Sequence, residues 1–148
     1  MPVLVPPVQT ALWALTQHVV ARGLLQRRRP GTLEKGLALA CFAAGAASAG
    51  GASSRFRERG TTWEPWAPET TSALVTDGPN AVTRNPMYVG MALVLVGSGL
   101  LSGRPWTALA AGGLLATLTP QVEREEAALA GLFGEEWTAY ARRVRRWV

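Results

Sequence analysis

The side chains that could do chemistry gather in two polar segments of the sequence, residues 76–88 and 123–146. The first contains Arg84 and Tyr88, and the second begins with glutamates and ends in a run of arginines. Arginine can hold a carboxylate through charge-assisted hydrogen bonds, and a glutamate can position a polar group or accept a proton from an amine. The two segments therefore have the residue types for binding and aligning charged groups.

Several other chemistries lack the residues they need. The 148-residue chain has one cysteine, Cys41, and one histidine, His18, whereas a zinc site, a disulfide or a cysteine–histidine nucleophile needs more partners. We therefore expect no metal site, and we interpret Cys41 as a packed thiol. The net charge of +5 could suggest nucleic acid. The basic residues flank apolar stretches, which instead favours membrane lipids as partners and argues against nucleic acid.

The elements that position these residues are apolar and long. Four stretches contain no charged side chain, apart from the carboxylate that ends the last of them, and each is about the length, roughly 20 residues, that crosses a hydrocarbon core. A soluble helical bundle would instead show a charged face with a 3.6-residue period. The sequence predicts an all-α integral membrane bundle with about four transmembrane helices. The stretches are Pro2–Ala21, Gly36–Ser54, Asn85–Gly103 and Pro105–Glu123.

We expect a single membrane domain, residues 1–148, with an N-terminal helical hairpin (1–54) and a core that carries the polar segments (55–148). The first hairpin turns at 26–32, and a long polar segment with Trp63 and Trp66 follows it. The second hairpin turns at 102–105, where Pro105 suits a first helical position. After Pro120 the pattern becomes amphipathic and predicts a juxtamembrane C-terminal helix.

Two spans lie between Tyr88 and Glu123, so the two polar segments must emerge on the same side of the membrane and can form one site. Most lysines and arginines lie on that side, which predicts a cytoplasmic site at a bacterial plasma membrane. Arg27, Arg28 and Arg29 argue against this orientation. Each side chain also has a plainer interpretation: Arg84 could reach lipid headgroups, Tyr88 could belong to an aromatic belt, and paired glutamates could form a solvated face.

The motifs in these segments resemble a known superfamily. The first segment contains Gly78-Pro79 and ends Arg84-Asn85-Pro86-Met87-Tyr88-Val89-Gly90, and the tail contains Glu125-Glu126-Ala127-Ala128-Leu129 and Phe133-Gly134-Glu135-Glu136-Trp137. In this order, separated by one helical hairpin, they are similar to the isoprenylcysteine carboxyl methyltransferases and phospholipid N-methyltransferases, which are membrane enzymes. The resemblance covers about half of the chain.

The resemblance implies a methyl transfer from S-adenosylmethionine, giving S-adenosylhomocysteine, to a lipophilic carboxylate or amine. It implies that Glu136 and Arg142 are the catalytic pair that binds the acceptor. On an unbroken helix these two side chains are about 240° apart, so both reach one pocket only if the helix bends or ends between them. It also implies a cofactor-binding set and a set of further substrate-binding residues. The first is Arg84, Asn85, Pro86, Tyr88, Glu125 and Glu126, and the second is Trp137, Tyr140 and Arg143.

The chain departs from the family pattern at several positions. Asn85 stands where the family has histidine, Asn80 replaces an aromatic residue, Ala81 a basic residue and Trp137 a tyrosine. Two alternatives therefore stay open: an NADPH-dependent membrane enzyme resembling steroid reductases, and a non-catalytic membrane scaffold. Neither the acceptor nor the oligomeric state follows from the sequence.

Overall fold

The computed structural model describes residues 5–23, 28–62 and 70–148. Some parts of the sequence interpretation lie outside these residues. They are the hairpin residues Gln26 and Arg27, the tryptophans Trp63 and Trp66, and the first residues of the apolar stretch that begins at Pro2.

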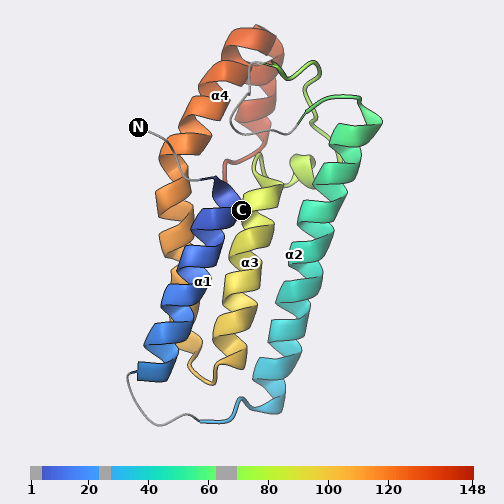
Figure 1. Cartoon of the computed structure of the whole chain (residues 1–148). Coiled ribbons are helices and arrows are strands. Elements are labelled where there is room, and N and C mark those ends of the chain that lie inside the picture. Colours follow the sequence, from blue (N-terminus) through green and yellow to red (C-terminus); the bar gives the residue numbers. More distant parts are fainter. Residues whose placement is uncertain (1–4, 24–27, 63–69) are drawn as a thin grey trace.

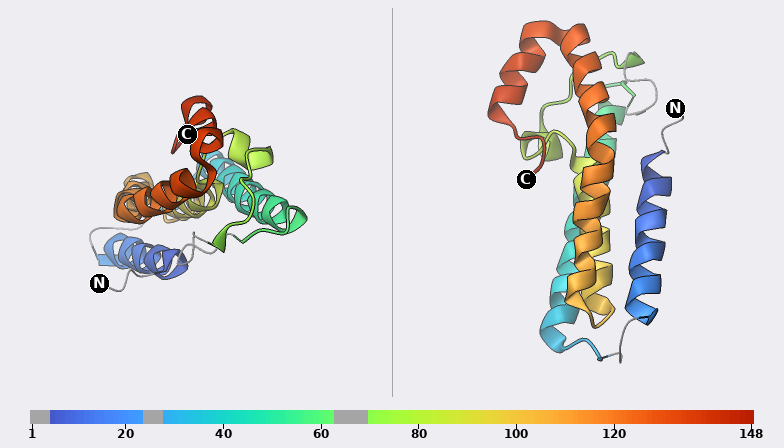
Figure 2. Two further views of the ribbon diagram at one scale, coloured as in Figure 1. Left: turned by 90° about the horizontal axis from the view of Figure 1, so that it is seen from above. Right: turned by 90° about the vertical axis from the view of Figure 1, so that its left-hand side faces the viewer.

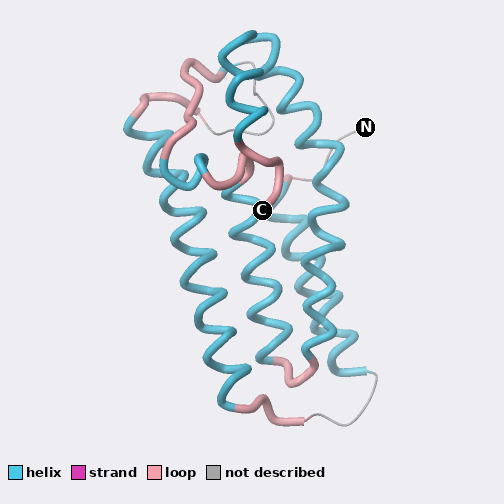
Figure 3. The backbone as a smooth tube through the Cα atoms, turned by 180° about the vertical axis from the view of Figure 1, so that it is seen from behind, coloured by secondary structure: helices cyan, strands magenta, loops and turns pink. Residues whose placement is uncertain are grey.

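The described residues form four α-helices and two short 3₁₀ helices and contain no strand, which confirms the all-α prediction (Figure 3). The α-helices run alternately up and down and pack side by side (Figure 1). We call the end that contains Pro6, Glu58 and Pro86 the site end, and the end that contains Gly23 and Thr32 the far end. The elements are α1 (Pro6–Gly23), α2 (Thr32–Glu58), η2 (Gly78–Ala81), α3 (Pro86–Leu101), η3 (Pro105–Leu109) and α4 (Ala110–Arg143).

The helices approach closely because small residues line their contacts. A Cβ atom added to Gly45 of α2 would lie 2.9 Å from the carbonyl oxygen of Gly90 in α3, and the reverse distance is 2.8 Å. On the other side of α3, the fully buried Leu95, Leu114 and Leu118 belong to one apolar cluster. Small residues at such contacts are typical of helices that pack within membranes.

One described helix, α2, is both long enough and apolar enough to cross a membrane. Helix α3 is apolar but shorter, with 16 residues, and α1 carries two buried polar side chains, Gln9 and Gln17. The prediction of four crossing helices therefore stays a prediction, supported directly at α2.

The second hairpin turns where the sequence analysis placed it. Ser102 and Gly103 follow α3, and Pro105 begins η3. Gly103 has a φ of +71°, and a Cβ atom there would lie 1.9 Å from the carbonyl oxygen of Arg28. Only glycine fits this position, because it tolerates the left-handed conformation and has no side chain to meet the neighbouring chain.

Helix α4 continues through Pro120 and then bends sharply at Gly134, where φ is +50°. Figure 2 shows that the segment after this bend turns back toward the bundle. A separate C-terminal helix was predicted to follow Pro120, but the break lies at Gly134 instead, and only residues 135–143 form a separate returning segment. The bend brings Trp137 and Tyr140 into contact with Leu74, which lies between α2 and η2.

Candidate functional site

The two polar segments meet at the site end through a direct contact between α3 and α4. The hydroxyl of Tyr88 donates a hydrogen bond to the Glu125 carboxylate at 2.8 Å, and the side-chain amide of Gln121 donates to the same oxygen at 2.9 Å. Burial raises the pKa of Glu125 even though these two donors favour its charged form. This contact agrees with the prediction that the intervening hairpin brings both polar segments to the same end of the bundle.

A second network surrounds Glu126, one residue further along α4. Its carboxylate forms ion pairs with Arg84 at 2.9 Å and with Arg146 at 2.8 Å. Both the Arg84 and the Glu126 side chains are mostly buried, so this pair is less screened than a surface pair. Carboxylate and guanidinium groups thus lock the end of the described chain onto the body of α4.

Arg84 also closes the end of the returning helical segment. One of its guanidinium nitrogens donates hydrogen bonds to the carbonyl oxygens of Ala141 at 3.0 Å and Val144 at 2.9 Å. These carbonyls lie at the C-terminal end of α4, where a helix leaves acceptors without intrahelical donors and favours positive charge. Arg84 therefore holds the segment that Gly134 turns back.

Two asparagines extend the same network. The side-chain amide of Asn85 donates to the carbonyl oxygen of Arg146 at 3.1 Å. The carbonyl oxygen of Asn80 accepts a hydrogen bond from the Tyr140 hydroxyl at 2.7 Å, and burial raises the pKa of Tyr140 to about 12. The side-chain oxygen of Asn80 is buried and has no hydrogen-bond partner. A buried acceptor without a donor costs free energy, so it marks a place that a ligand donor could satisfy.

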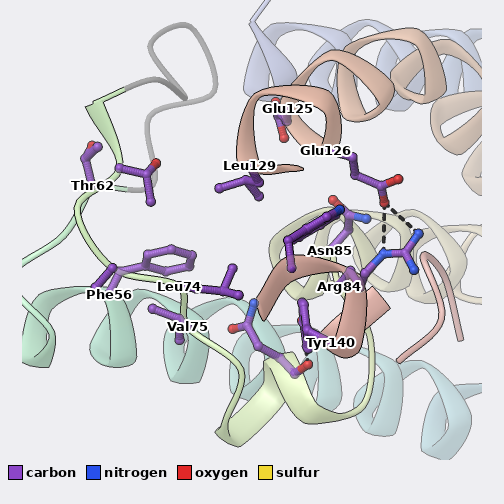
Figure 4. A pocket seen from close by; sticks show the side chains of 14 residues that line it. Phe56, Thr62, Leu74, Val75, Arg84, Asn85, Glu125, Glu126, Leu129 and Tyr140 are labelled. Atoms are coloured by element: carbon purple, nitrogen blue, oxygen red, sulfur yellow. Dashed lines mark hydrogen bonds and ion pairs between the residues drawn. The ribbon is translucent and has the colours of Figure 1, made fainter. Parts of the chain in front are cut away.

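Two pockets adjoin at this network, with volumes of about 100 and 300 Å³. The smaller pocket lies among Leu74, Leu129, Trp137 and Tyr140, and it has Glu126 on its wall (Figure 4). The larger pocket is more apolar and lies between the start of α1 and the first turns of α3. Both pockets share one floor, which consists of Phe56, Asn80, Arg84, Asn85 and Glu125.

Most of the residues expected at a site line these pockets. Each of the six residues expected to bind the cofactor lines at least one pocket, as do two of those expected to bind substrate. They are Arg84, Asn85, Pro86, Tyr88, Glu125 and Glu126, with Trp137 and Tyr140.

The expected acceptor pair lies elsewhere. Glu136, Arg142 and Arg143 are exposed and line neither of these pockets. The helical segment is regular between Glu136 and Arg142, because its bend at Gly134 precedes both residues. The bend that would have turned both side chains into one pocket is thus absent from the stretch between them, and their role stays a prediction.

Three polar site residues, and Phe56 of the shared floor, were not singled out in the sequence. Gln121 could have been found, because it lies four residues before Glu125 and so on the same helical face. Asn80 appeared only as a departure from a motif, and Arg146 only as part of a basic run. No pattern along the chain indicates that Asn80 meets Tyr140 across 60 residues.

One of three comparisons with known proteins gives a match. A family model described as phospholipid methyltransferase matches residues 33–136, which is more than half of the chain. The matched region contains Arg84, Tyr88, Glu125 and Glu126, and it ends before Arg142. No curated protein and no solved structure matches the chain significantly.

Proposed function

The chain belongs to the phospholipid methyltransferase family, and from this premise we propose that it transfers a methyl group from S-adenosylmethionine to a lipophilic acceptor. The observation that carries the proposal is the shared floor of the two pockets. The smaller pocket, which has the larger share of polar lining, and the larger, more apolar pocket meet there at mostly buried charged and amide groups. A methyltransferase that joins a polar, cationic donor to a lipophilic acceptor needs such a meeting place.

The residues of the floor fit the cofactor. S-adenosylmethionine carries a sulfonium, an ammonium and a carboxylate, together with ribose hydroxyls and an adenine. The unpartnered side-chain oxygen of Asn80 can accept from a hydroxyl or amino group. Glu125 adds a carboxylate that would attract a cation, and Trp137 adds an aromatic ring on the wall of the smaller pocket. Bound there, the cofactor would supply an activated methyl group.

The apolar pocket suits the acceptor. Its walls include Val5, Pro7, Met87 and Met91. Methionine side chains are flexible and fill irregular gaps, so they can adapt to chains of different shape. The pocket volume of about 300 Å³ is at the lower end of the usual range for small-molecule sites. We propose that the reactive head of the acceptor reaches the shared floor and that its apolar part occupies this pocket.

The protein's contribution to the reaction would be alignment and exclusion of water. A carboxylate acceptor is already ionised at neutral pH, so it needs mainly a dry site and a correct approach. An amine acceptor must first lose a proton. Glu125 is the mostly buried carboxylate at the floor, and burial raises its pKa, which makes it a stronger base than an ordinary glutamate.

The exposed pair Glu136 and Arg142 gives a competing location for the acceptor. Arg142 would then hold a substrate carboxylate and Glu136 would position it, at the surface of the returning segment. The two locations make opposite predictions for matched glutamate variants, because Glu125 lines the shared floor and Glu136 is exposed.

The first test titrates the purified protein in detergent with S-adenosylhomocysteine and, separately, with NADPH. Isothermal calorimetry measures the binding. We expect S-adenosylhomocysteine to bind. Glu125→Gln should weaken it about tenfold or more, since a hydrogen bond to a charged group contributes about 1.5–3 kcal/mol. The control Glu136→Gln should change it less than twofold. Binding of NADPH alone, or of neither molecule, contradicts the proposal and favours the reductase or the scaffold.

The second test locates the acceptor by following transfer of labelled methyl groups into a membrane lipid extract. Met91→Trp should fill the apolar pocket and strongly reduce transfer, while affinity for S-adenosylhomocysteine stays within a few-fold. If Glu136→Gln or Arg142→Ala abolishes transfer and Met91→Trp does not, the acceptor lies at the exposed pair. Mass spectrometry of the labelled products would identify it.

We also propose that the site end faces the cytoplasm. Arg55, Arg57 and Arg59 at the end of α2 and the arginines after Tyr140 lie at this end, and lysines and arginines are enriched on cytoplasmic loops. A reporter enzyme that is active only in the cytoplasm, fused after Val148, should be active. An inactive fusion, together with an active periplasmic reporter, would reverse the orientation.

A further inference from the structure

The far end contains a groove that has no part in the proposed reaction. It lies between α1, α2 and α3 and has a volume of about 590 Å³. Its walls are mixed: Leu15, Phe42 and Leu101 are apolar, and Gln17, His18 and Ser102 are polar. Such a surface suits a ligand with both an apolar and a polar part.

Gln17 is the buried polar side chain of this groove, with only 5% of its surface exposed. Its amide nitrogen donates hydrogen bonds to the carbonyl oxygen of Leu95 at 3.0 Å and to the hydroxyl of Thr107 at 3.4 Å. Its side-chain oxygen is buried and has no hydrogen-bond partner. An acceptor in this condition calls for a donor from outside the chain.

Arg104 adjoins this groove through its backbone, which contacts the groove residue Ser102 and the Gln17 partner Thr107. Its backbone N–H donates to the hydroxyl of Ser102 at 3.1 Å, and its carbonyl oxygen accepts from Thr107 at 2.9 Å. Arg104 is 6% exposed, yet the Nε and Nη2 atoms of its guanidinium have no hydrogen-bond partner, and no ion pair with a described residue involves it. A buried cation without an anion is costly, so the site is incomplete without a negatively charged group.

The charge around Arg104 has the same sign. Arg22, Arg29 and Lys35 lie near the ends of α1 and α2 at the far end. The acidic residue described at this end, Glu34, is already paired with Arg28. The surroundings of Arg104 therefore attract anions, and no described carboxylate at this end is free to neutralise its charge.

We propose that the far end binds an anionic phospholipid whose phosphate pairs with Arg104. A hydroxyl of its headgroup donates to the side-chain oxygen of Gln17, and its acyl chain occupies the groove along Leu15 and Phe42. The apolar wall favours a lipid over free phosphate, because inorganic phosphate would leave that wall uncovered. This lipid is a resident ligand at the opposite end from the methyl-transfer site, so the proposal does not rest on the proposed function.

Native mass spectrometry of the full chain, without cofactor or acceptor, tests the proposal with two lipids that carry the same acyl chains. Phosphatidylglycerol is anionic and has headgroup hydroxyls, whereas phosphatidylcholine is zwitterionic and has none. We expect phosphatidylglycerol to bind more tightly. Arg104→Gln should weaken it about fivefold or more, as expected for loss of one arginine near a lipid phosphate. The control Arg29→Gln, at an exposed arginine, should weaken it less than twofold.

Other outcomes would overturn the proposal. One is equal binding of phosphatidylglycerol and phosphatidylcholine. Another is unchanged binding of phosphatidylglycerol to the Arg104→Gln variant. The third is stabilisation of the protein by millimolar inorganic phosphate that equals the stabilisation by phosphatidylglycerol. Ser98→Phe provides a second variant if Arg104→Gln fails to fold, because it fills the groove and leaves Arg104 in place. It should also weaken phosphatidylglycerol, and unchanged binding would exclude the groove as the site of the acyl chain.

Discussion

The two ends of the bundle treat their charged residues in opposite ways. At the site end, Arg84, Arg146, Glu123 and Glu126 form one network that joins distant parts of the chain. At the far end, the buried Arg104 has no described partner for two of its nitrogens. The difference lies in the buried arginines: ion pairs within the chain neutralise Arg84 at the site end, whereas Arg104 at the far end has no anionic partner among the described residues.

The largest expected effect comes from breaking the internal network. Arg84→Ala would remove the ion pair to Glu126 and the hydrogen bonds to Ala141 and Val144. Loss of one partner from a mostly buried pair costs about 3–5 kcal/mol, so the free energy of unfolding should fall by about 3 kcal/mol. Denaturant unfolding in detergent measures it. The exposed Arg142→Ala should change it by less than about 0.5 kcal/mol, and equal losses would contradict the comparison.

The next effect concerns the backbone at the far end. Gly103→Ala should lower the free energy of unfolding by about 2 kcal/mol, because the residue has a positive φ and its new Cβ would meet the carbonyl of Arg28. The matched control is Gly112→Ala, where nothing lies within 4 Å of the added atom inside a helix. That change should stabilise the protein by up to about 1 kcal/mol. A loss at Gly112 as large as that at Gly103 would refute the reason given.

The smallest expected effect is a dependence on pH at the site end. Because the pKa of Glu125 is raised on folding, the folded protein holds this proton more tightly than the unfolded chain. The contribution of the protonated Glu125 side chain to the free energy of unfolding is complete below the ordinary glutamate pKa. It is lost as the pH rises through the raised pKa of the folded protein. One proton limits the slope to about 1.4 kcal/mol per pH unit.

Measurements of the free energy of unfolding between about pH 4 and 8 would show this decrease with pH. Glu125→Gln should remove it, and Glu136→Gln should keep it. An unchanged slope in Glu125→Gln would assign the pH dependence to another group.

Much of the framework followed from the sequence alone. The absence of charges in long stretches predicted helices, and the turn residues Gly103 and Pro105 placed the second hairpin correctly. Because two helices separate them, Tyr88 and the glutamates of α4 were predicted to lie at the same end of the bundle. The Tyr88–Glu125 hydrogen bond confirms this. These features depend on local pattern and connectivity, and both can be deduced from residue order.

The rest depends on contacts between distant residues. Gly134 lies between helix-forming residues, so the local sequence does not predict its positive φ. The bend there is tied to the packing of the returning segment against Leu74, a distant residue. The role of Arg84 at the carbonyls of Ala141 and Val144 depends on that same bend. The exposure of Glu136 also follows from it, because the bend fixes which face of the last segment turns inward.

The fold-back at Gly134 also has a consequence for biosynthesis. Thr83 hydrogen-bonds to the carbonyl of Arg146, 63 residues further along the chain. At a synthesis rate of about 5–20 residues per second, Arg84 and its neighbours wait roughly 3–13 s before their partners are made. Helix α3 and the part of α4 before Gly134 are synthesised before the closing segment. The smaller pocket is therefore finished last, and a nascent chain that stops at Gly134 lacks the closing segment with Trp137 and Tyr140.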